Sequence, residues 1–327
     1  MNILVLGGTV FVGRAIVAEA LKRGHGVTLF HRGQRGADLF PGVERVLGDR
    51  DGDLSQLQAR SWDAVIDTCG YHPRVVRHSA EALRNNAGKY LFISTISVYA
   101  DDAPAPLTEE SKLDQFDHEP QDEAINGDTY GPFKVQCEEV VRDVYQDRAQ
   151  IVRPGLVIGP FDPTDRFTYW PVRMAGQAEV LVPAELDQPS QWIDTRDLAN
   201  LTLNVLEKEE ALVVNASGPE HTITLGQTLE RIREVANPGC RFVQPEQEFL
   251  DEHGVEPWKD LPLAFPAGDS GASGMVSIER ALGHGLSLRP LEDTVRDLMY
   301  WWETQRRELK AGLTVEREAE LLALLAH

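Results

Sequence analysis

The first half of the chain alternates between short, continuous apolar runs and longer stretches whose apolar residues recur at helical spacing. Continuous apolar runs of this length are typical of strands that are buried on both faces of a parallel sheet. The pattern predicts strands at residues 2–7, 26–33, 43–52, 62–70, 89–100 and 149–160. It predicts helices at residues 13–24, 75–88 and 130–146. Strands that alternate with helices in this way favour an α/β fold with a doubly wound parallel sheet.

The alternation is interrupted once and then becomes less regular. Residues 101–129 form an acidic stretch with several prolines, and a loop of this length inside a domain is usually functional or mobile. Beyond residue 160 we expect a smaller second lobe. There, residues 222–236 indicate a strand end, a threonine cap and a helix. Residues 255–274 indicate a loop, and the tail from about Pro290 indicates helices.

The composition narrows the classes of protein that fit this pattern. The 327 residues carry a formal net charge of −20, which repels nucleic acid phosphates and acidic membranes. No apolar run approaches the roughly 20 residues of a membrane span, and no signal-peptide pattern precedes the first strand. Cys69, Cys137 and Cys240 lie far apart, without metal or redox spacing. We expect a cytoplasmic protein that holds no metal and binds neither nucleic acid nor a membrane.

The first strand is followed by the pattern GGTVFVG at residues 7–13. Glycines between a strand and a helix allow a tight turn and close helix packing, and the helix N–H groups then face a dinucleotide's phosphates. Val10 stands where such a turn usually has its middle glycine. We therefore expect the loop to differ in shape but still to bind the phosphates of a dinucleotide. The expected contacts come from Gly7, Thr9, Val10, Phe11, Val12 and Gly13.

The end of the second predicted strand bears on the choice of cofactor. A site that prefers NAD places Asp or Glu here to bind the ribose 2′-hydroxyl. This chain has His31, Arg32 and Arg35 instead. No carboxylate would repel a 2′-phosphate, and Arg32 would pair with one unless it is only a solvated surface charge. The pattern therefore favours NADP(H), with NAD(H) as the alternative.

These motifs define the expected domains. Residues 1–160 are expected to form a dinucleotide-binding Rossmann domain, to which part of 190–217 returns. Residues 161–327 are expected to form mainly the substrate-binding lobe and the C-terminal helices. The predicted fold class is α/β, a Rossmann doubly wound parallel sheet with a smaller C-terminal substrate lobe.

A tyrosine and a lysine stand at the start of the long predicted helix. Tyr130 and Lys134 are four positions apart, which puts both side chains on one face of the helix. The pair is preceded by the strand FISTISVYA, residues 92–100, which carries several hydroxyl groups. A pair at this spacing is common by chance, and the glycine turn and the preceding strand distinguish this one.

With these motifs the chain resembles the extended or atypical branch of the short-chain dehydrogenase/reductase superfamily, the NAD-dependent epimerase/dehydratase-like proteins. The resemblance runs from residue 1 to about 300 and includes isoflavone-reductase-like and chloroplast stem-loop-binding-protein-like sequences. The motifs that carry it are GGTVFVG, GDRDGDL, FISTISVY, YGPFK, RPGLVIGP and WIDTRDLA.

The resemblance implies roles for individual residues. Tyr130 matches the catalytic acid/base and Lys134 its partner, whose charge favours the phenolate of a group with a pKa near ~10. Thr95 matches the Ser/Thr member of the site, and Ser97 is the competing candidate. The positions implied for cofactor contact are Asp49 and Arg50 at the adenine, Thr68, Cys69 and Gly70 at the ribose and phosphates, and Tyr130, Lys134, Pro154 and Gly155 towards the nicotinamide.

The substrate side departs from the sugar-nucleotide members of the superfamily. Those members usually carry an Asn in the strand-six motif, which here is VRPGLVIGP, and their dehydratases follow the catalytic Thr with acids, where this chain has Ile96. The pattern looks more like that of reductases of aromatic or carbonyl substrates. The candidate substrate contacts are Ser97, Arg166, Tyr169, Trp170 and Arg173. Aromatic rings and arginines clamp polar rings or anions, but they also pack lobes together.

We therefore expect an NAD(P)-dependent oxidoreductase that transfers a hydride to or from a small carbonyl or alcohol substrate. Tyr130 would give the proton, and Thr95 would bind the same substrate oxygen. One alternative is a nucleotide-sugar epimerase or dehydratase that retains NAD. Another is a non-catalytic cofactor- or RNA-binding module, against which the net charge of −20 argues. We expect a monomer or a homodimer, because members of the superfamily often dimerise through helices beside the active site.

Overall fold

The computed structural model describes residues 1–116, 118, 120, 122–266 and 275–326. The chain folds into two compact units. The first unit consists of Met1–Val157, Thr195–Ser217 and Val276–Ser287, and the second consists of the rest of the described chain. The predicted first domain ends at 160, three residues beyond Val157. Val276–Ser287, which we predicted in the second domain, lies in the first because its helix packs on strand β11 (Leu212–Ala216).

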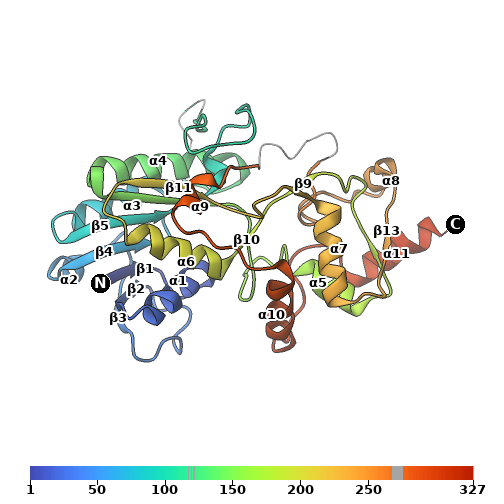
Figure 1. Cartoon of the computed structure of the whole chain (residues 1–327), viewed down its shortest axis with the longest axis horizontal. Helices are drawn as coiled ribbons and strands as arrows, with labels where there is room; N and C mark the ends of the chain where they lie inside the picture. The colour runs from blue at the N-terminus through green and yellow to red at the C-terminus, as the bar shows by residue number, and fades with distance from the viewer. Residues whose placement is uncertain (117, 119, 121, 267–274, 327) are drawn as a thin grey trace. The chain divides into compact units, whose positions relative to one another are not determined.

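A sheet of seven strands forms the centre of the first unit, and each strand runs parallel to its neighbours. Their order is β11-β6-β5-β4-β1-β2-β3, so the order reverses between β1 and β4 (Figure 1). This Rossmann-like order agrees with the predicted doubly wound sheet. The other strands are β1 (Asn2–Leu6), β2 (Gly26–His31), β3 (Glu44–Leu47), β4 (Trp62–Asp67), β5 (Ala87–Ile93) and β6 (Ala149–Pro154).

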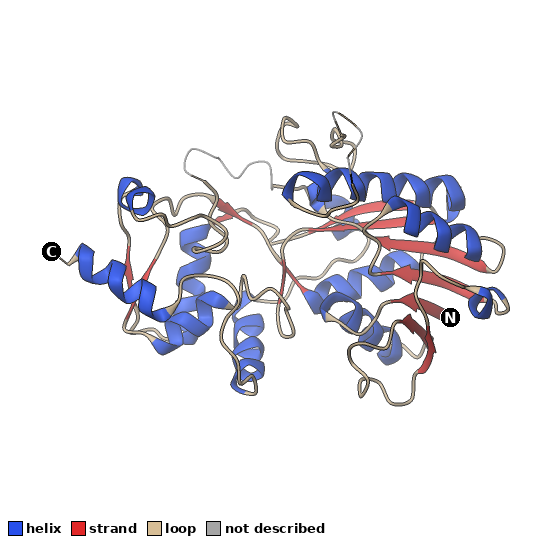
Figure 2. Cartoon of the chain, turned by 180° about the vertical axis from the view of Figure 1, so that it is seen from behind, coloured by secondary structure: helices blue, strands red, loops and turns tan. Residues whose placement is uncertain are grey.

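Helices cover both faces of this sheet. On one face α1 (Phe11–Lys22) packs with α6 (Thr195–Leu206), and on the other α3 (Pro73–Leu83) packs with α4 (Gly127–Tyr145) (Figures 1 and 2). Residues Ile3–Val5 of β1 are consequently fully buried, which explains the unbroken apolar run in the sequence. The shorter elements are α2 (Ser55–Gln58), the 3₁₀ turns η1 (Ile96–Val98) and η2 (Gln146–Arg148), α9 (Glu279–Gly283), and β7 (Val157–Ile158) at the division of the units.

The fifth strand is shorter than predicted. It ends at Ile93 instead of residue 100, and η1 follows. Thr95 caps this turn, because its side-chain oxygen accepts a hydrogen bond from Ser97 N. A side chain that binds the backbone locally competes with the hydrogen bonds of a sheet, and this explains the early end of the strand. The strand also begins early, at Ala87, two residues inside the helix that we predicted at 75–88.

Helix α4 begins three residues before its predicted start. Asn126 and Thr129 form a capping box, in which each side chain accepts a hydrogen bond from the other residue's backbone N–H. The described residues of the acidic stretch before Gly127 contain no regular helix or strand. Residues 117, 119 and 121 of that stretch, and 267–274 of the loop predicted at 255–274, lie outside the described residues.

The second unit is built around three helices that contact one another, α5 (Tyr169–Gly176), α7 (Leu225–Ala236) and α10 (Leu291–Glu303). Thr224 caps α7 through Gln227 N, as predicted. The predicted helical tail is divided between α10 and α11 (Val315–Leu325). The remaining elements are β8 (Glu179–Leu181) paired with β13 (Arg241–Val243), β9 (Pro189–Ser190) paired with β12 (Ile223–Thr224), β10 (Ile193–Asp194) and α8 (Gln247–Glu252).

Candidate functional site

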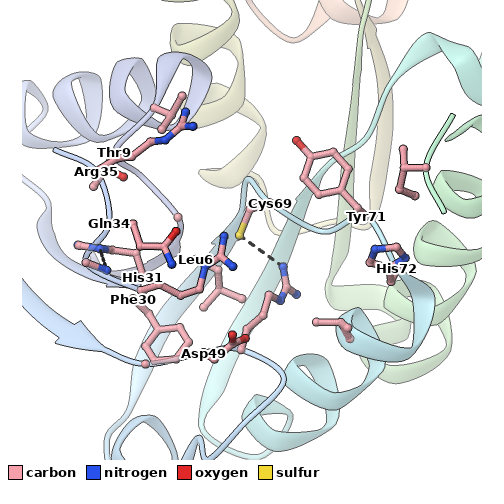
Figure 3. Close-up of a pocket in the computed structure, with 18 residues that line it drawn as sticks. Leu6, Thr9, Phe30, His31, Gln34, Arg35, Asp49, Cys69, Tyr71 and His72 are labelled. Carbon is pink, nitrogen blue, oxygen red and sulfur yellow. Dashed lines mark hydrogen bonds between the residues drawn. The ribbon is translucent and has the colours of Figure 1, made fainter. Parts of the chain in front are cut away.

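A cavity of about 710 Å³ lies at the carboxyl ends of β1, β2 and β4 in the first unit, where the strand order reverses. Ligands of open α/β sheets bind at such a switch point. Figure 3 shows Thr9 and Arg35 close together on one side of this cavity, Tyr71 and His72 on the opposite side, and Asp49 at its lower edge. Side chains from four separate loops therefore converge on one space.

The glycine turn holds two residues in the left-handed region, with φ of 99° at Gly7 and 87° at Gly8. Glycine adopts such angles without the steric cost of a Cβ atom. A Cβ atom on Gly7 would also lie 2.5 Å from Thr68 Oγ1, and one on Gly13 would lie 2.9 Å from the Gly8 backbone. The glycines thus allow the first turn of α1 to approach both the end of β1 and the loop after β4.

Val10 occupies the position of the missing middle glycine. Its φ of −129° and ψ of 137° are those of extended backbone, which every residue type adopts. The positive φ falls on Phe11 instead, at 33°. The Val10 side chain is 38% exposed and lines the cavity, so it narrows the space beside the turn without closing it.

The N-terminus of α1 offers backbone donors. No side chain of the described residues caps this twelve-residue helix. The N–H groups of Phe11, Val12 and Gly13 lie in its first turn, where intrahelical acceptors are lacking. Free N–H groups at the positive end of a helix dipole are suited to bind an anion. The turn therefore presents the chemistry that a phosphate group requires.

Arg32 and Arg35, from the loop after β2, line the cavity with exposed side chains. The described part of the chain shows no ion pair or hydrogen bond for either side chain. Asp49 contributes the one carboxylate among the described lining residues, and its Oδ1 accepts a hydrogen bond from Asp51 N at 3.1 Å. The end of β2 thus presents positive charge, and no acid, to a ligand.

Arg50 lines the cavity too, but its charge is already paired. Its Nη1 and Nη2 donate to the two carboxylate oxygens of Asp67 at 2.8 and 2.7 Å, and Nη2 also donates to Ser79 Oγ at 2.6 Å. Tyr90 donates a further hydrogen bond to Asp67 at 2.8 Å. Burial alone would raise the pKa of Asp67, yet the Arg50 guanidinium holds that pKa below its usual value. Arg50 is therefore part of a buried ion pair as well as a cavity residue.

The loop after β4 is held tightly against its neighbours. Thr68 Oγ1 donates to Leu6 O at 2.9 Å. A Cβ atom on Gly70 would lie 2.5 Å from the Phe92 ring, so this position has no room for a side chain. Cys69 lines the cavity, and burial raises the pKa of its thiol, which keeps it protonated at neutral pH.

Tyr130 and Lys134 lie one turn apart on α4. Tyr130 is half-buried, and its ring centroid lies 6.5 Å from that of Tyr71. Lys134 is only 3% exposed, and its Nζ donates to the carbonyl oxygens of Gly70 and Ile93 at 2.9 and 2.8 Å. The lysine is thus bound to the main chain of the loop after β4 and of the last residue of β5, contacts that the spacing of the pair did not predict.

Thr95 and Ser97, the competing candidates for the hydroxyl member of the site, are hydrogen-bonded to each other. Thr95 Oγ1 donates to Ser97 Oγ and accepts from Ser97 N, both at 3.1 Å. Thr95 is buried, whereas Ser97 is exposed. The two hydrogen-bonded hydroxyl groups therefore form a pair, the Thr95–Ser97 hydroxyl unit, whose solvent-exposed member is Ser97.

Gly131 determines how closely α4 approaches this unit. A Cβ atom on Gly131 would lie 2.3 Å from Ser97 O. We expect Gly131→Ala to push η1 away from the helix and to lower the free energy of unfolding by about 1–3 kcal/mol, measured by urea denaturation. Gly127→Ala on the same helix, where an added Cβ meets nothing within 4 Å, is the control. Equal stabilities of the two variants would contradict this close contact.

Pro154 and Gly155 lie at the end of β6, close to η1. Pro154 is the last residue of β6, and Gly155 N donates to Ala216 O at 2.9 Å. A Cβ atom on Gly155 would lie 2.7 Å from Ser217 Oγ and 3.6 Å from Ile96 Cδ1. The chain after β6 therefore passes directly beside the hydroxyl unit.

The second unit contains the other candidate substrate residues, and most of them are buried within it. Tyr169 and Trp170 are fully buried, and Trp170 Nε1 donates to Pro262 O at 2.8 Å. Arg173 is 5% exposed and lies 3.5 Å from the buried carboxylate of Glu318. Packing inside the second unit therefore accounts for these three side chains.

Arg166 differs from those three because it is exposed. Its guanidinium carbon lies 5.8 Å from the ring centroid of Trp258, which is itself 39% exposed. Arg166 and Trp258 therefore form a surface contact of the second unit, and Arg166 is the member of the group that remains accessible to a ligand.

The predicted cofactor residues divide into two sets. Those that line the cavity are Gly7, Thr9, Val10, Arg32, Asp49, Arg50 and Cys69. Those that do not line it are Phe11, Val12, Gly13, Thr68, Gly70, Tyr130, Lys134, Pro154 and Gly155. Sequence reasoning missed Tyr71 and Ile125 as lining residues. Tyr71 directly follows the predicted cofactor residues Thr68, Cys69 and Gly70, which is a signal that could have found it, whereas nothing local marks Ile125 in its acidic stretch.

The described residues contain neither a metal-binding cluster nor a membrane-spanning helix. No group of His, Cys, Asp and Glu in that part of the chain is arranged to hold a metal ion. None of its helices combines the length and the apolar character that crossing a bilayer requires. All three cysteines are free thiols.

The sequence matches the model of the NAD-dependent epimerase/dehydratase family over residues 3–217. It is also 28% identical over 317 residues to the chloroplast stem-loop binding protein of 41 kDa b of Arabidopsis thaliana. That alignment covers 91% of this chain and 77% of the relative.

Solved structures with a similar fold include two epimerases. The UDP-glucose 4-epimerase of Thermotoga maritima, solved with UDP-glucose, has a TM-score of 0.65 at 17% identity, covering 93% of this chain and 99% of that one. The UDP-glucuronic acid 4-epimerase of Bacillus cereus, in complex with NAD, has a TM-score of 0.66 at 17% identity. That match covers 94% of this chain and 98% of the epimerase. At these identities the likeness is one of fold.

Proposed function

Because the chain belongs to the NAD-dependent epimerase/dehydratase family, a family of NAD-dependent enzymes, we propose that it is an oxidoreductase whose dinucleotide binds in the cavity at the β1–β4 switch point. The bound dinucleotide would exchange a hydride with a small carbonyl or alcohol substrate. The observation that carries the proposal is the convergence of an uncapped helix N-terminus and unpaired arginines on one cavity. Its volume of about 710 Å³ is within the usual range for cofactor sites.

Among dinucleotides, NADP(H) is the favoured cofactor in this proposal. Arg32 and Arg35 would pair with a 2′-phosphate, and the end of β2 has no carboxylate to bind a free 2′-hydroxyl. Thr9, which Figure 3 shows beside Arg35, offers a further hydroxyl. NAD(H) is the alternative, and the structural neighbours solved in complex with NAD support it.

The chemistry at the substrate would rest on α4 and η1. When bound, the dinucleotide supplies or accepts the hydride. In the reductive direction Tyr130 would donate its phenolic proton to the substrate oxygen as negative charge develops there. The Thr95–Ser97 hydroxyl unit would donate a hydrogen bond to the same oxygen. The ammonium group of Lys134, one turn along α4, would favour the phenolate that remains.

Two other functions are supported by particular observations. The epimerases among the structural neighbours support a nucleotide-sugar epimerase or dehydratase that retains NAD. The name of the Arabidopsis relative supports a module that binds stem-loop RNA. The net charge of −20 argues against the RNA-binding module. The lack of an Asn in VRPGLVIGP argues against a sugar-nucleotide epimerase or dehydratase, and Ile96 after Thr95 argues further against a dehydratase.

A titration with NADPH, NADH, NADP⁺ and NAD⁺ by calorimetry tests the proposed function. We expect NADPH to bind most tightly, and Arg32→Ala to weaken NADPH binding about ten- to hundredfold while NADH binding stays unchanged, since only NADPH has the 2′-phosphate. Arg84→Ala, which removes an exposed arginine at the end of α3, is the matched control.

Each other outcome of this titration has a definite meaning. Equal losses for NADH and NADPH in the Arg32 variant would refute the preference for NADP(H). If none of the four dinucleotides binds, the oxidoreductase proposal fails. Binding of a stem-loop RNA that weakens steeply with salt would then support the RNA-binding module.

A further inference from the structure

Lys134 carries a buried charge that contacts main chain and aromatic rings. Among the described residues no carboxylate lies within ion-pair distance of its Nζ, which instead donates to Gly70 O and Ile93 O. Burial lowers the pKa of Lys134 to about 8. Because the folded protein then holds this proton less tightly than the unfolded chain, the charged lysine reduces stability at neutral pH. The contacts of this ammonium group show which parts of the site it connects.

The two acceptor carbonyls belong to different segments of the site, the loop after β4 and the carboxyl end of β5. Gly70 lies between Cys69 and Tyr71, which both line the dinucleotide cavity. Ile93 is the last residue of β5 and leads directly into η1 with the Thr95–Ser97 hydroxyl unit. The ammonium group of Lys134 thus connects α4 to the wall of the cavity and, in the other direction, to the hydroxyl turn.

Aromatic rings complete the surroundings of this ammonium group. Its Nζ lies 4.1 Å from the ring centroid of Phe92 and 5.6 Å from that of Tyr71, and both distances fit a cation–π contact. Gly70 packs directly on Phe92, since a Cβ atom there would lie 2.5 Å from the ring. The lysine is therefore enclosed by the loop after β4 and by the carboxyl end of the adjacent strand β5.

On the basis of the proposed function, we propose that Lys134 is a positioning residue that fixes the separation between the cavity wall at Cys69–Tyr71 and the hydroxyl turn at Thr95–Ser97. This separation determines how far the reactive end of a bound dinucleotide lies from the hydroxyls that bind the substrate oxygen. The role is additional to any direct contact of Lys134 with a ligand, and it exists in the free protein.

Backbone hydrogen exchange of the free protein tests this role. In Lys134→Met, which keeps the length of the side chain but has no donor, we expect the amides of Cys69 and Tyr99 to exchange about ten- to hundredfold faster, because each loop loses a hydrogen bond to a charged group. The amides of β1, Ile3–Leu6, are expected to keep their rates. Lys22→Met, on the exposed face of α1, is the matched control for loss of a lysine.

The outcomes separate this inference from the proposed function. Unchanged exchange in both loops of Lys134→Met would overturn the positioning role, whatever happens to ligand binding. Faster exchange in both loops, with no dinucleotide binding even to the unmodified protein, would preserve the positioning role and refute the oxidoreductase. If Lys134→Met does not fold, Lys134→Gln, which retains N–H donors, is measured instead. Uniform acceleration across β1 and both loops in that variant would overturn the inference.

Discussion

Tyr130→Phe is expected to slow the reduction of a carbonyl substrate by NADPH about 10²–10⁴-fold, because the variant loses the phenolic proton donor. The phenylalanine keeps the ring and its packing near Tyr71, whose centroid lies 6.5 Å away. Tyr130 does not line the dinucleotide cavity, so the affinity for NADPH is expected to stay within about twofold. The measurement is the loss of NADPH absorbance under single-turnover conditions with a panel of aromatic aldehydes and ketones.

Tyr71→Phe is the matched control for this experiment, since Tyr71 is the other phenol near the site. Tyr71 lines the cavity and is 48% exposed, while its partial burial raises the pKa of its phenol. We expect this variant to lose less than about tenfold in rate. A larger loss in Tyr71→Phe than in Tyr130→Phe would mean that the proton comes from Tyr71 and that the role carried over to Tyr130 is wrong.

The largest expected effect on stability comes from the buried ion pair beside the cavity. Arg50→Met would leave the Asp67 carboxylate, which is fully buried, without its bidentate partner. Removal of one member of a buried pair typically lowers the free energy of unfolding by about 3–5 kcal/mol. We expect a loss of this size at pH 7 by urea denaturation. Arg60→Met, which breaks the more exposed pair with Glu44, should cost less than about 1 kcal/mol.

The loss of unfolding free energy in Arg50→Met is also expected to depend on pH. In the unmodified protein the pKa of Asp67 lies below its usual value, so the pair stabilises the fold above the unfolded pKa of about 3.9. That contribution disappears as the pH falls through the folded pKa. In the variant, burial without Arg50 raises the pKa of Asp67, so protonation relieves the unpaired charge. The difference in the free energy of unfolding between the unmodified protein and Arg50→Met should therefore shrink from pH 7 towards pH 4. A difference that stays constant over this range would contradict a charged Asp67.

The sheet and the position of the cavity were predictable because they depend on patterns that repeat locally. Each buried parallel strand is a continuous apolar run, and the glycine turn at residues 7–13 marks where the first strand meets its helix. The end of β5 was not predictable in this way. The β-branched run through Val98 has the composition of a strand, but one hydrogen bond from Ser97 N to Thr95 ends the strand early.

The roles of charged and aromatic residues were harder to predict because their partners are distant in the sequence. Arg50 follows Asp49 in a loop, and its partner Asp67 comes 17 residues later, at the end of the next strand. Trp170 lies in a segment rich in arginines and aromatic rings, which is typical of a ligand clamp, yet it is fully buried. Burial depends on the packing of the whole unit, so the local pattern does not decide between the two interpretations.

The conformation of Val10 has a consequence for how such turns are recognised in other sequences. The angles that demand glycine lie at Gly7 and Gly8, whereas residue 10 is extended and accepts a side chain. A search pattern that insists on three evenly spaced glycines would thus reject this chain at a position where the backbone imposes no such demand. A pattern that requires glycine at positions 7, 8 and 13 and leaves position 10 open would collect further chains with this turn.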